Sequence, residues 1–143
     1  MTMLRTLILT ALMLRLAAVP AVRADKQADN ALARADAARR VYEGLLAPNT
    51  SATPTGKGNP STGPDYDQIY AWSLRWMQAA QDVSDKREDR ISAVQAHVDR
   101  MRKLEDIVRA QREKQSASDA DVAATQYFRL QAEADLMKLQ AAK

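Results

Sequence analysis

The chain has 143 residues, enough for one modest domain, and carries 21 basic residues, 18 acidic residues and a single histidine. It contains no cysteine, which excludes disulfide bonds and thiolate metal sites. Only four glycines and one phenylalanine occur in a background rich in Ala, Leu, Arg and Gln, and this composition predicts an all-α fold.

The first 24 residues have the composition of a secretory signal peptide. They contain no acidic residue, Arg5 lies near the start, and the apolar run Thr6–Leu14 follows. Val22 and Ala24 are the small residues of a cleavage point after Ala24, so residues 1–24 are predicted to be a leader and the mature protein to be periplasmic or secreted. A mitochondrial import sequence and an uncleaved anchor remain alternatives. The apolar run is too short for a membrane span.

The excess of positive charge belongs to this predicted leader. Arg5, Arg15 and Arg23 account for three of the 21 basic residues, and the 18 that remain equal the 18 acidic residues. The predicted mature chain is therefore formally neutral, which gives no support to a nucleic-acid-binding surface. Membrane contact is expected only through an uncleaved leader.

Three regions follow the leader. Residues 25–46 are predicted to form an N-terminal helix, because their apolar side chains recur three and four residues apart. Residues 47–64 hold four of the five prolines and three of the four glycines but no large apolar side chain, so they are predicted to be a disordered linker. Residues 65–143 are predicted to form a helical hairpin domain.

The hairpin domain is predicted to begin with a helix over residues 66–83. Asp65 is its predicted N-cap. Trp72 and Trp76 are four residues apart on this helix, and we expect them to pack between helices and to hold this helix on the hairpin. The polar stretch 84–90 leaves open whether the helix continues through it or stops and restarts there.

An antiparallel pair of helices is predicted over residues 87–141. The first arm carries apolar side chains at 3-4 spacing, at Ile91, Val94, Val98, Met101, Leu104 or Glu105, and Val108. Ser118 and Asp121 form a predicted capping box that opens the second arm. The second arm is expected to bury Val122, Gln126 or Tyr127, Leu130, Ala134 and Met137. A short turn makes the arms antiparallel neighbours in coiled-coil contact, and the two preceding helices or self-association are the predicted covers of their open edge.

No catalytic, cofactor or metal site is predicted. His97 is the one histidine, and it lacks the cysteine or second histidine that would converge with it on a metal or substrate. The region around Lys57 does not have the spacing of a phosphate loop. We therefore expect a non-enzymatic protein that needs no cofactor and acts through its helical faces on a protein partner or on itself. Neither a nucleic acid nor a small-molecule substrate is expected.

The stretch from Arg90 to Leu136 resembles a group of exported bacterial proteins of uncharacterised function. That group carries the motifs A-x-x-x-H-[LV]-x-R-M-x-x-L-E and S-x-x-D-[VL]-x-x-x-x-[YE]-[YF]-R-L-x-A-E. The matching residues here are His97, Val98, Arg100, Met101, Leu104, Glu105, Ser118, Asp121, Val122, Tyr127, Phe128, Arg129, Leu130, Ala132 and Glu133. The likeness covers about residues 37–141.

That group is in turn similar to the coiled-coil hairpin of TolC-type outer-membrane efflux proteins. The resemblance implies a helical hairpin, export, and a role beside an envelope efflux or secretion system. The glycine usual before the turn of such hairpins is replaced here by Gln115 and Ser116. The alternative expectation is a periplasmic chaperone-like or stress-sensing helical protein, and the least favoured is an enzyme or metal binder that uses His97.

Overall fold

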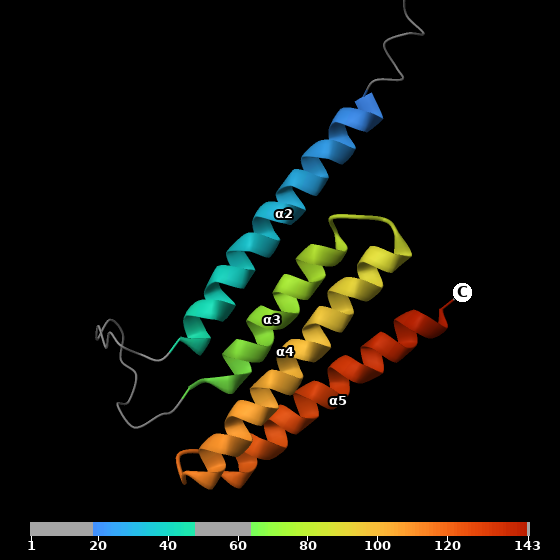
Figure 1. Cartoon of the computed structure of the whole chain (residues 1–143). Helices are drawn as coiled ribbons and strands as arrows, with labels where there is room; N and C mark the ends of the chain where they lie inside the picture. Colours follow the sequence, from blue (N-terminus) through green and yellow to red (C-terminus); the bar gives the residue numbers. More distant parts are fainter. Residues whose placement is uncertain (1–18, 48–63, 143) are drawn as a thin grey trace, which may run out of the picture.

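The computed structural model describes residues 19–47 and 64–142, and these residues form four helices and no strand (Figure 1). The all-α prediction is confirmed for this part of the chain. The predicted leader up to residue 18, and residues 48–63 of the predicted linker, lie outside the described residues.

The four helices are α2 (Val19–Leu46), α3 (Tyr66–Gln81), α4 (Arg87–Glu113) and α5 (Asp119–Ala141). Helix α2 starts before residue 25, where the N-terminal helix was predicted to begin, and runs through the predicted cleavage point after Ala24. Each helix packs on the next one along the chain, and α3 also touches α5 (Figure 1). Helices α2 and α5 are therefore the outer members of this row.

Local capping signals place two of the helix starts. The side chain of Asp65 accepts a hydrogen bond from the backbone N–H of Gln68 at 3.0 Å, as an N-cap does. Ser118 and Asp121 exchange both bonds of a capping box, with the Asp121 N–H 3.1 Å from Ser118 Oγ and the Ser118 N–H 2.8 Å from the Asp121 carboxylate. Both predicted caps are confirmed.

The polar stretch between α3 and α4 interrupts the helix. Helix α3 ends at Gln81, and α4 restarts at Arg87 with Lys86 as its N-cap residue. Lys86 makes no side-chain capping bond, whereas Ser84 Oγ donates to the Asp89 carboxylate at 2.6 Å. The question that the sequence left open is thus answered in favour of a stop and restart.

The turn between α4 and α5 uses a left-handed residue that is not glycine. Gln115 has φ 59°, its N–H donates to the Arg112 carbonyl, and the Ser116 N–H donates to the Gln111 carbonyl, both at 2.9 Å. This pair of bonds is a Schellman motif, which usually has glycine at the position of Gln115. The two hydrogen bonds of this motif end α4 although the residue in the left-handed conformation, Gln115, carries a side chain.

Gln115→Gly is expected to raise the free energy of unfolding by about 0.5–1 kcal/mol. A left-handed conformation costs a non-glycine residue about 1–2 kcal/mol, and glycine removes this cost. Glycine also has more conformational freedom to lose on folding, which offsets part of the gain. Urea unfolding measures the change. Ser116→Gly is the matched control, because among the described non-glycine residues only Gln115 has a positive φ, and this control is expected to gain nothing.

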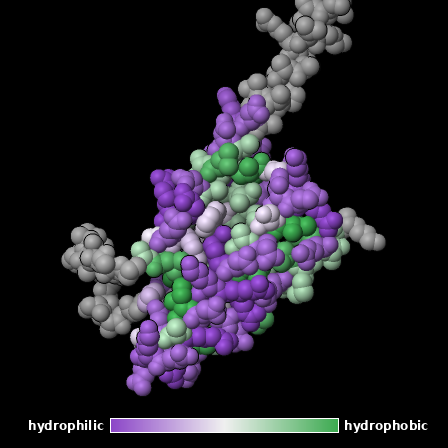
Figure 2. All heavy atoms as spheres, in the orientation of Figure 1, coloured by the Kyte–Doolittle hydropathy of each residue, from purple (hydrophilic) through white to green (hydrophobic). Residues whose placement is uncertain are grey.

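The main core lies where α3, α4 and α5 meet, with one large contribution from α2. Its buried residues are Tyr42, Ile69, Val98, Met101, Leu104, Val108, Phe128 and Ala132. The predicted stripe of α4 is buried from Val94 to Val108, with Leu104 and Glu105 both buried, whereas Ile91 at its start is only partly buried. Outside this core, hydrophilic residues cover most of the face seen in Figure 2, and apolar patches lie between them.

The predicted buried face of α5 is wrong. The buried residues of α5 are Thr125, Phe128 and Ala132, whereas Leu130 and Met137 are exposed. Phe128 is fixed in the core because its ring stacks on Tyr70 of α3, with centroids 4.3 Å apart and ring planes 11° apart. Docking this ring turns the other apolar side of α5 outward.

The two tryptophans pack between helices, as predicted: they lie against α2, and both are also packed against the main core. The ring of Trp76 lies 5.9 Å from the ring of Tyr42 on α2. Trp72 lines a shallow pocket of about 310 Å³ together with Ala37 and Ala38 of α2 and residues of α3. The aromatic cluster of α3 therefore joins α2 to the rest of the molecule.

Candidate functional site

Ser73, His97 and Arg100 form a buried polar cluster between α3 and α4. Ser73 Oγ lies 2.8 Å from His97 Nδ1, and Arg100 Nε donates to the same Oγ at 2.7 Å. Arg100 also donates from Nη2 to the Ser73 carbonyl oxygen at 3.2 Å. Oγ accepts from Arg100 and has one proton and one further lone pair for Nδ1, so it pairs with either tautomer of a neutral His97.

Burial controls the charge of this cluster. Ser73 is 0% and His97 2% exposed. Desolvation, helped by the nearby charge of Arg100, lowers the pKa of His97 from 6.5 to about 4. Desolvation also lowers the pKa of Arg100 to about 10.

Aromatic rings hold the Arg100 cation in this buried position. Its guanidinium carbon lies 4.0 Å from the centre of the Trp76 ring and 5.9 Å from that of Tyr42. Such cation–π contacts offset part of the cost of removing the charge from water. Through Tyr42 and Trp76, the polar cluster also connects to the contact between α2 and α3.

The Ser73–His97 contact joins the atom pair of a nucleophilic serine and its base, but its setting is structural. The hydroxyl is enclosed, and its lone pair accepts from Arg100, so a substrate has no access to it. A hollow of about 900 Å³ lies elsewhere, between the start of α3 and the α4–α5 turn, and neither Ser73 nor His97 lines it. The cluster fixes the position of α3 on α4.

Sequence reasoning identified His97 but missed its partners. His97 lies among the buried positions of α4 and the partly buried Arg100 follows three residues later, and that placement of two polar residues was the available signal. Within the described residues, no group of three or more His, Asp or Glu side chains is placed to hold a metal ion. None of the four described helices is long and apolar enough to cross a membrane.

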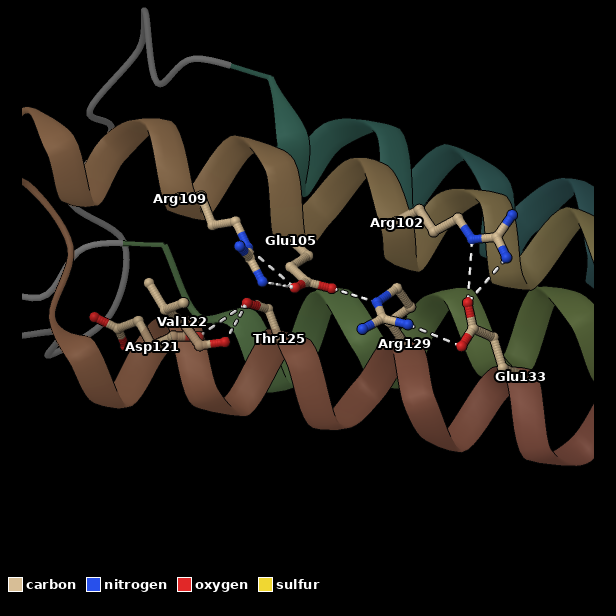
Figure 3. A network of polar contacts seen from close by, with 8 residues as sticks. All are labelled: Arg102, Glu105, Arg109, Asp121, Val122, Thr125, Arg129 and Glu133. Carbon is tan, nitrogen blue, oxygen red and sulfur yellow. Dashed lines mark hydrogen bonds and ion pairs between the residues drawn. The ribbon is translucent and has the colours of Figure 1, made fainter.

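An ion network joins α4 to α5 on one side of their contact (Figure 3). Glu105, 4% exposed, accepts hydrogen bonds from Arg109 of its own helix and from Arg129 of α5. Glu133 of α5 accepts from Arg129 at 2.8 Å and from Arg102 of α4 at 2.9 Å. The four charged residues around Glu105 therefore tie about two turns of α4 to about one turn of α5.

The carboxylate of Glu105 stays ionised in this network. Burial by itself would raise its pKa, but the hydrogen bonds from Arg129 and Arg109 outweigh burial and hold the pKa below its usual range. Thr125, next to the network in Figure 3, satisfies its buried hydroxyl by donating to the Asp121 and Val122 carbonyls of its own helix at 3.0 and 3.1 Å. The α4–α5 contact is thus specific and fully paired at this point.

The outer face of α5 carries three of the five exposed large apolar side chains among the described residues; the other two, Leu32 and Val41, lie on α2. Apolar residues alternate four and three apart along it, at Ala123, Tyr127, Leu130, Ala134, Met137 and Ala141. We call these six residues the α5 outer stripe. Its three large side chains are 61%, 49% and 63% exposed, in the order Tyr127, Leu130 and Met137.

The α5 outer stripe has the pattern of a coiled-coil seam. Its residues occupy the a and d positions of a heptad, and the buried Thr125 and Ala132 fall on the f position, directly opposite. A helix with one buried seam and a second exposed seam can pack against other helices on both sides.

Comparison with protein-family models, with curated proteins and with solved structures finds no match to this chain.

Proposed function

We propose that this protein is a non-enzymatic interaction protein of the cell envelope that docks a protein helix on the α5 outer stripe. The observation that carries the proposal is the heptad spacing of exposed apolar side chains along almost the whole of α5. Scattered single apolar residues on a surface are ordinary, but an aligned exposed row is typical of an interaction surface.

The energetic argument rests on the three large side chains of the stripe. Burying apolar surface gains about 25 cal/mol per Å², and Tyr127, Leu130 and Met137 are 61%, 49% and 63% exposed. A helix with its own apolar a and d positions would cover all three at once, because the side chains of facing seams interdigitate. A flat or polar partner would leave these three side chains partly exposed to water.

The proposal includes a division of roles among the helices. Helices α4 and α5 act as an antiparallel coiled-coil hairpin, and α2 and α3 act as its covers on the side away from the stripe. Residues 1–24 act as the leader that takes the chain to the envelope, which their acid-free apolar composition supports.

A photo-crosslinking amino acid at position 130 tests the docking surface in the producing cell. We expect it to form a discrete protein adduct, because Leu130 lies in the middle of the stripe. The matched control is the same probe at position 32, since Leu32 is also an exposed leucine, 54% against 49%, but lies on α2.

A second change on the same surface completes this test. Met137→Glu is expected to abolish the adduct formed at position 130, because it places a charge on the seam and not at the probe. Equal adducts from positions 130 and 32, or none from 130, would contradict the proposed docking role.

A further inference from the structure

We infer that the helix docked on the α5 outer stripe is α5 of a second copy of this chain, packed parallel to the first about a two-fold axis. The inference rests on the proposed function for its choice of surface and adds the identity and direction of the partner. It is carried by the charges that flank the stripe.

The heptad assigns those flanking positions. With Tyr127 and Ala134 at a, and Leu130 and Met137 at d, the g position falls on Glu133 and the e position falls on Lys138. In a parallel pair, each g residue faces the e residue five positions further along the partner helix. Glu133 of one copy then faces Lys138 of the other, and the two-fold axis makes this contact twice.

The other flanking positions agree with a parallel pair. Gln126 occupies the preceding g position and Gln131 the e position that faces it across the axis. Both are uncharged amides that can hydrogen-bond to each other, and both are at least partly exposed. No like charges oppose one another at these positions in the parallel arrangement.

An antiparallel pair would be electrostatically worse. There, g positions face g positions, so Glu133 would lie opposite Glu133 of the second copy, and Lys138 would face the uncharged Ala124. Glu133 is 25% exposed and already paired with Arg102 and Arg129 of its own chain. In the antiparallel pair, Glu133 of the second chain would add a like charge beside it and no new cation. Direction is therefore set by the Glu133–Lys138 pairs.

Of the two flanking residues, Lys138 is the exposed one, whereas Glu133 keeps 25% of its side chain exposed while paired with Arg102 and Arg129. The Lys138 side chain is 74% exposed, and its ion pair with Asp135 within α5 spans 3.3 Å on the surface. Such an exposed pair stabilises little, so the flexible ammonium group can turn toward a second copy. Helix α5 is an outer helix of the row, and its stripe lies opposite the buried Thr125 and Ala132, so its three large apolar side chains are open to a second copy.

The size of the contact sets the expected affinity. The stripe runs over residues 123–141, about 28 Å of helix at 1.5 Å per residue. A contact limited to one helix face of this length falls short of the roughly 800 Å² per partner of a standard stable interface. We expect a dimer that dissociates in the micromolar range.

Sedimentation equilibrium of the purified full chain, from 1 to several hundred micromolar, tests the inference. We expect a monomer–dimer equilibrium. Leu130→Lys is expected to abolish dimerisation, whereas Leu32→Lys, the matched change on α2, is expected to leave it unchanged. A chain that is monomeric throughout, or a dimer that Leu130→Lys does not weaken, would overturn the inference.

Charge reversal tests the direction of the pair. Lys138→Glu is expected to weaken the dimer about five- to tenfold, because it turns two attractive contacts into repulsive ones, and Lys103→Glu on the exposed face of α4 is the control. Glu133→Lys is expected to weaken it as well, and the double variant Glu133→Lys/Lys138→Glu to dimerise more tightly than Glu133→Lys alone. Both of these variants lose the same contacts to Arg102 and Arg129, so their difference isolates residue 138.

The outcomes separate this inference from the proposed function. An unchanged dimer in Lys138→Glu would overturn the parallel arrangement. A monomeric chain that still forms its position-130 adduct with a different protein in the cell would overturn the second copy as partner and leave the docking surface in place. A position-130 adduct with twice the mass of the chain supports both.

Discussion

Lowering the pH from 7 to 4 is expected to reduce the free energy of unfolding by about 3 kcal/mol through His97 alone. The buried ring has a pKa of about 4 in the folded protein and about 6.5 when unfolded. Between these values the unfolded chain binds a proton that the folded chain does not, so protonation favours unfolding as the pH falls. A difference of about 2.5 pKa units corresponds to the stated energy at 1.36 kcal/mol per unit.

Urea unfolding at several pH values between 7 and 4 measures this effect. His97 is the only histidine, so no other side chain with an ordinary pKa titrates through the upper part of the window. Glu105 acts at lower pH, because its pKa is depressed in the folded state, and its contribution is present above its unfolded pKa and lost as the pH falls through the folded one.

The control for this prediction is His97→Gln. Glutamine keeps a hydrogen-bonding group toward Ser73 but does not titrate, so its stability should be almost flat between pH 6.5 and 5. An equally steep decline in His97→Gln would show that the His97 ring is not the cause, and that it is not buried in neutral form.

The starts of α3 and α5 and the core face of α4 could be predicted because their signals are local. Asp65 and Ser118 bond to backbone groups three residues away, so the sequence around each of them contains the whole interaction. Helix α4 has one apolar stripe, and its orientation follows from that stripe alone. Neither prediction depends on what the helix packs against.

The orientation of α5 could not be predicted because this helix has two apolar stripes with similar spacing. One contains Phe128 and Ala132, and the other contains Leu130 and Met137. The choice between them depends on the ring of Tyr70, which lies on α3 and offers a stacking partner to Phe128 only. A contact between helices therefore decided what the periodicity within one helix left ambiguous.

The polar cluster was hidden for the same reason. The positions of His97 and Arg100 on α4 could be assigned from the sequence, but their bonds are to Ser73 on α3. Serine is unremarkable in a helix, and only the packing of α3 on α4 brings its hydroxyl and carbonyl oxygen to the two side chains. Separated residues of this kind need the tertiary arrangement before their chemistry can be recognised.

Tyr42→Ala is expected to lower the free energy of unfolding by about 3–5 kcal/mol and to release α2 from α3. Tyr42 is 5% exposed and is the one large buried side chain in residues 25–46 of α2, since the other two buried residues of that stretch, Ala31 and Ala38, are small. Its ring packs beside Trp76 and near the Arg100 cation. Removing the ring leaves a cavity where α2 enters the main core, beside the partly buried Leu45 and Leu46.

Tryptophan fluorescence and amide hydrogen exchange measure the two parts of this result. Both tryptophans of the chain face α2, so their emission should shift to longer wavelength in Tyr42→Ala as water reaches Trp72 and Trp76. Amides of α2 should lose protection while those of α4, which is held by its own core and by the Glu105 network, should keep it. Tyr42→Phe retains the ring and should stay within about 1 kcal/mol of the parent chain. If the α2 amides kept full protection in Tyr42→Ala, the prediction would be wrong. Ala31 and Ala38 would then be enough to hold α2 in place without the Tyr42 ring.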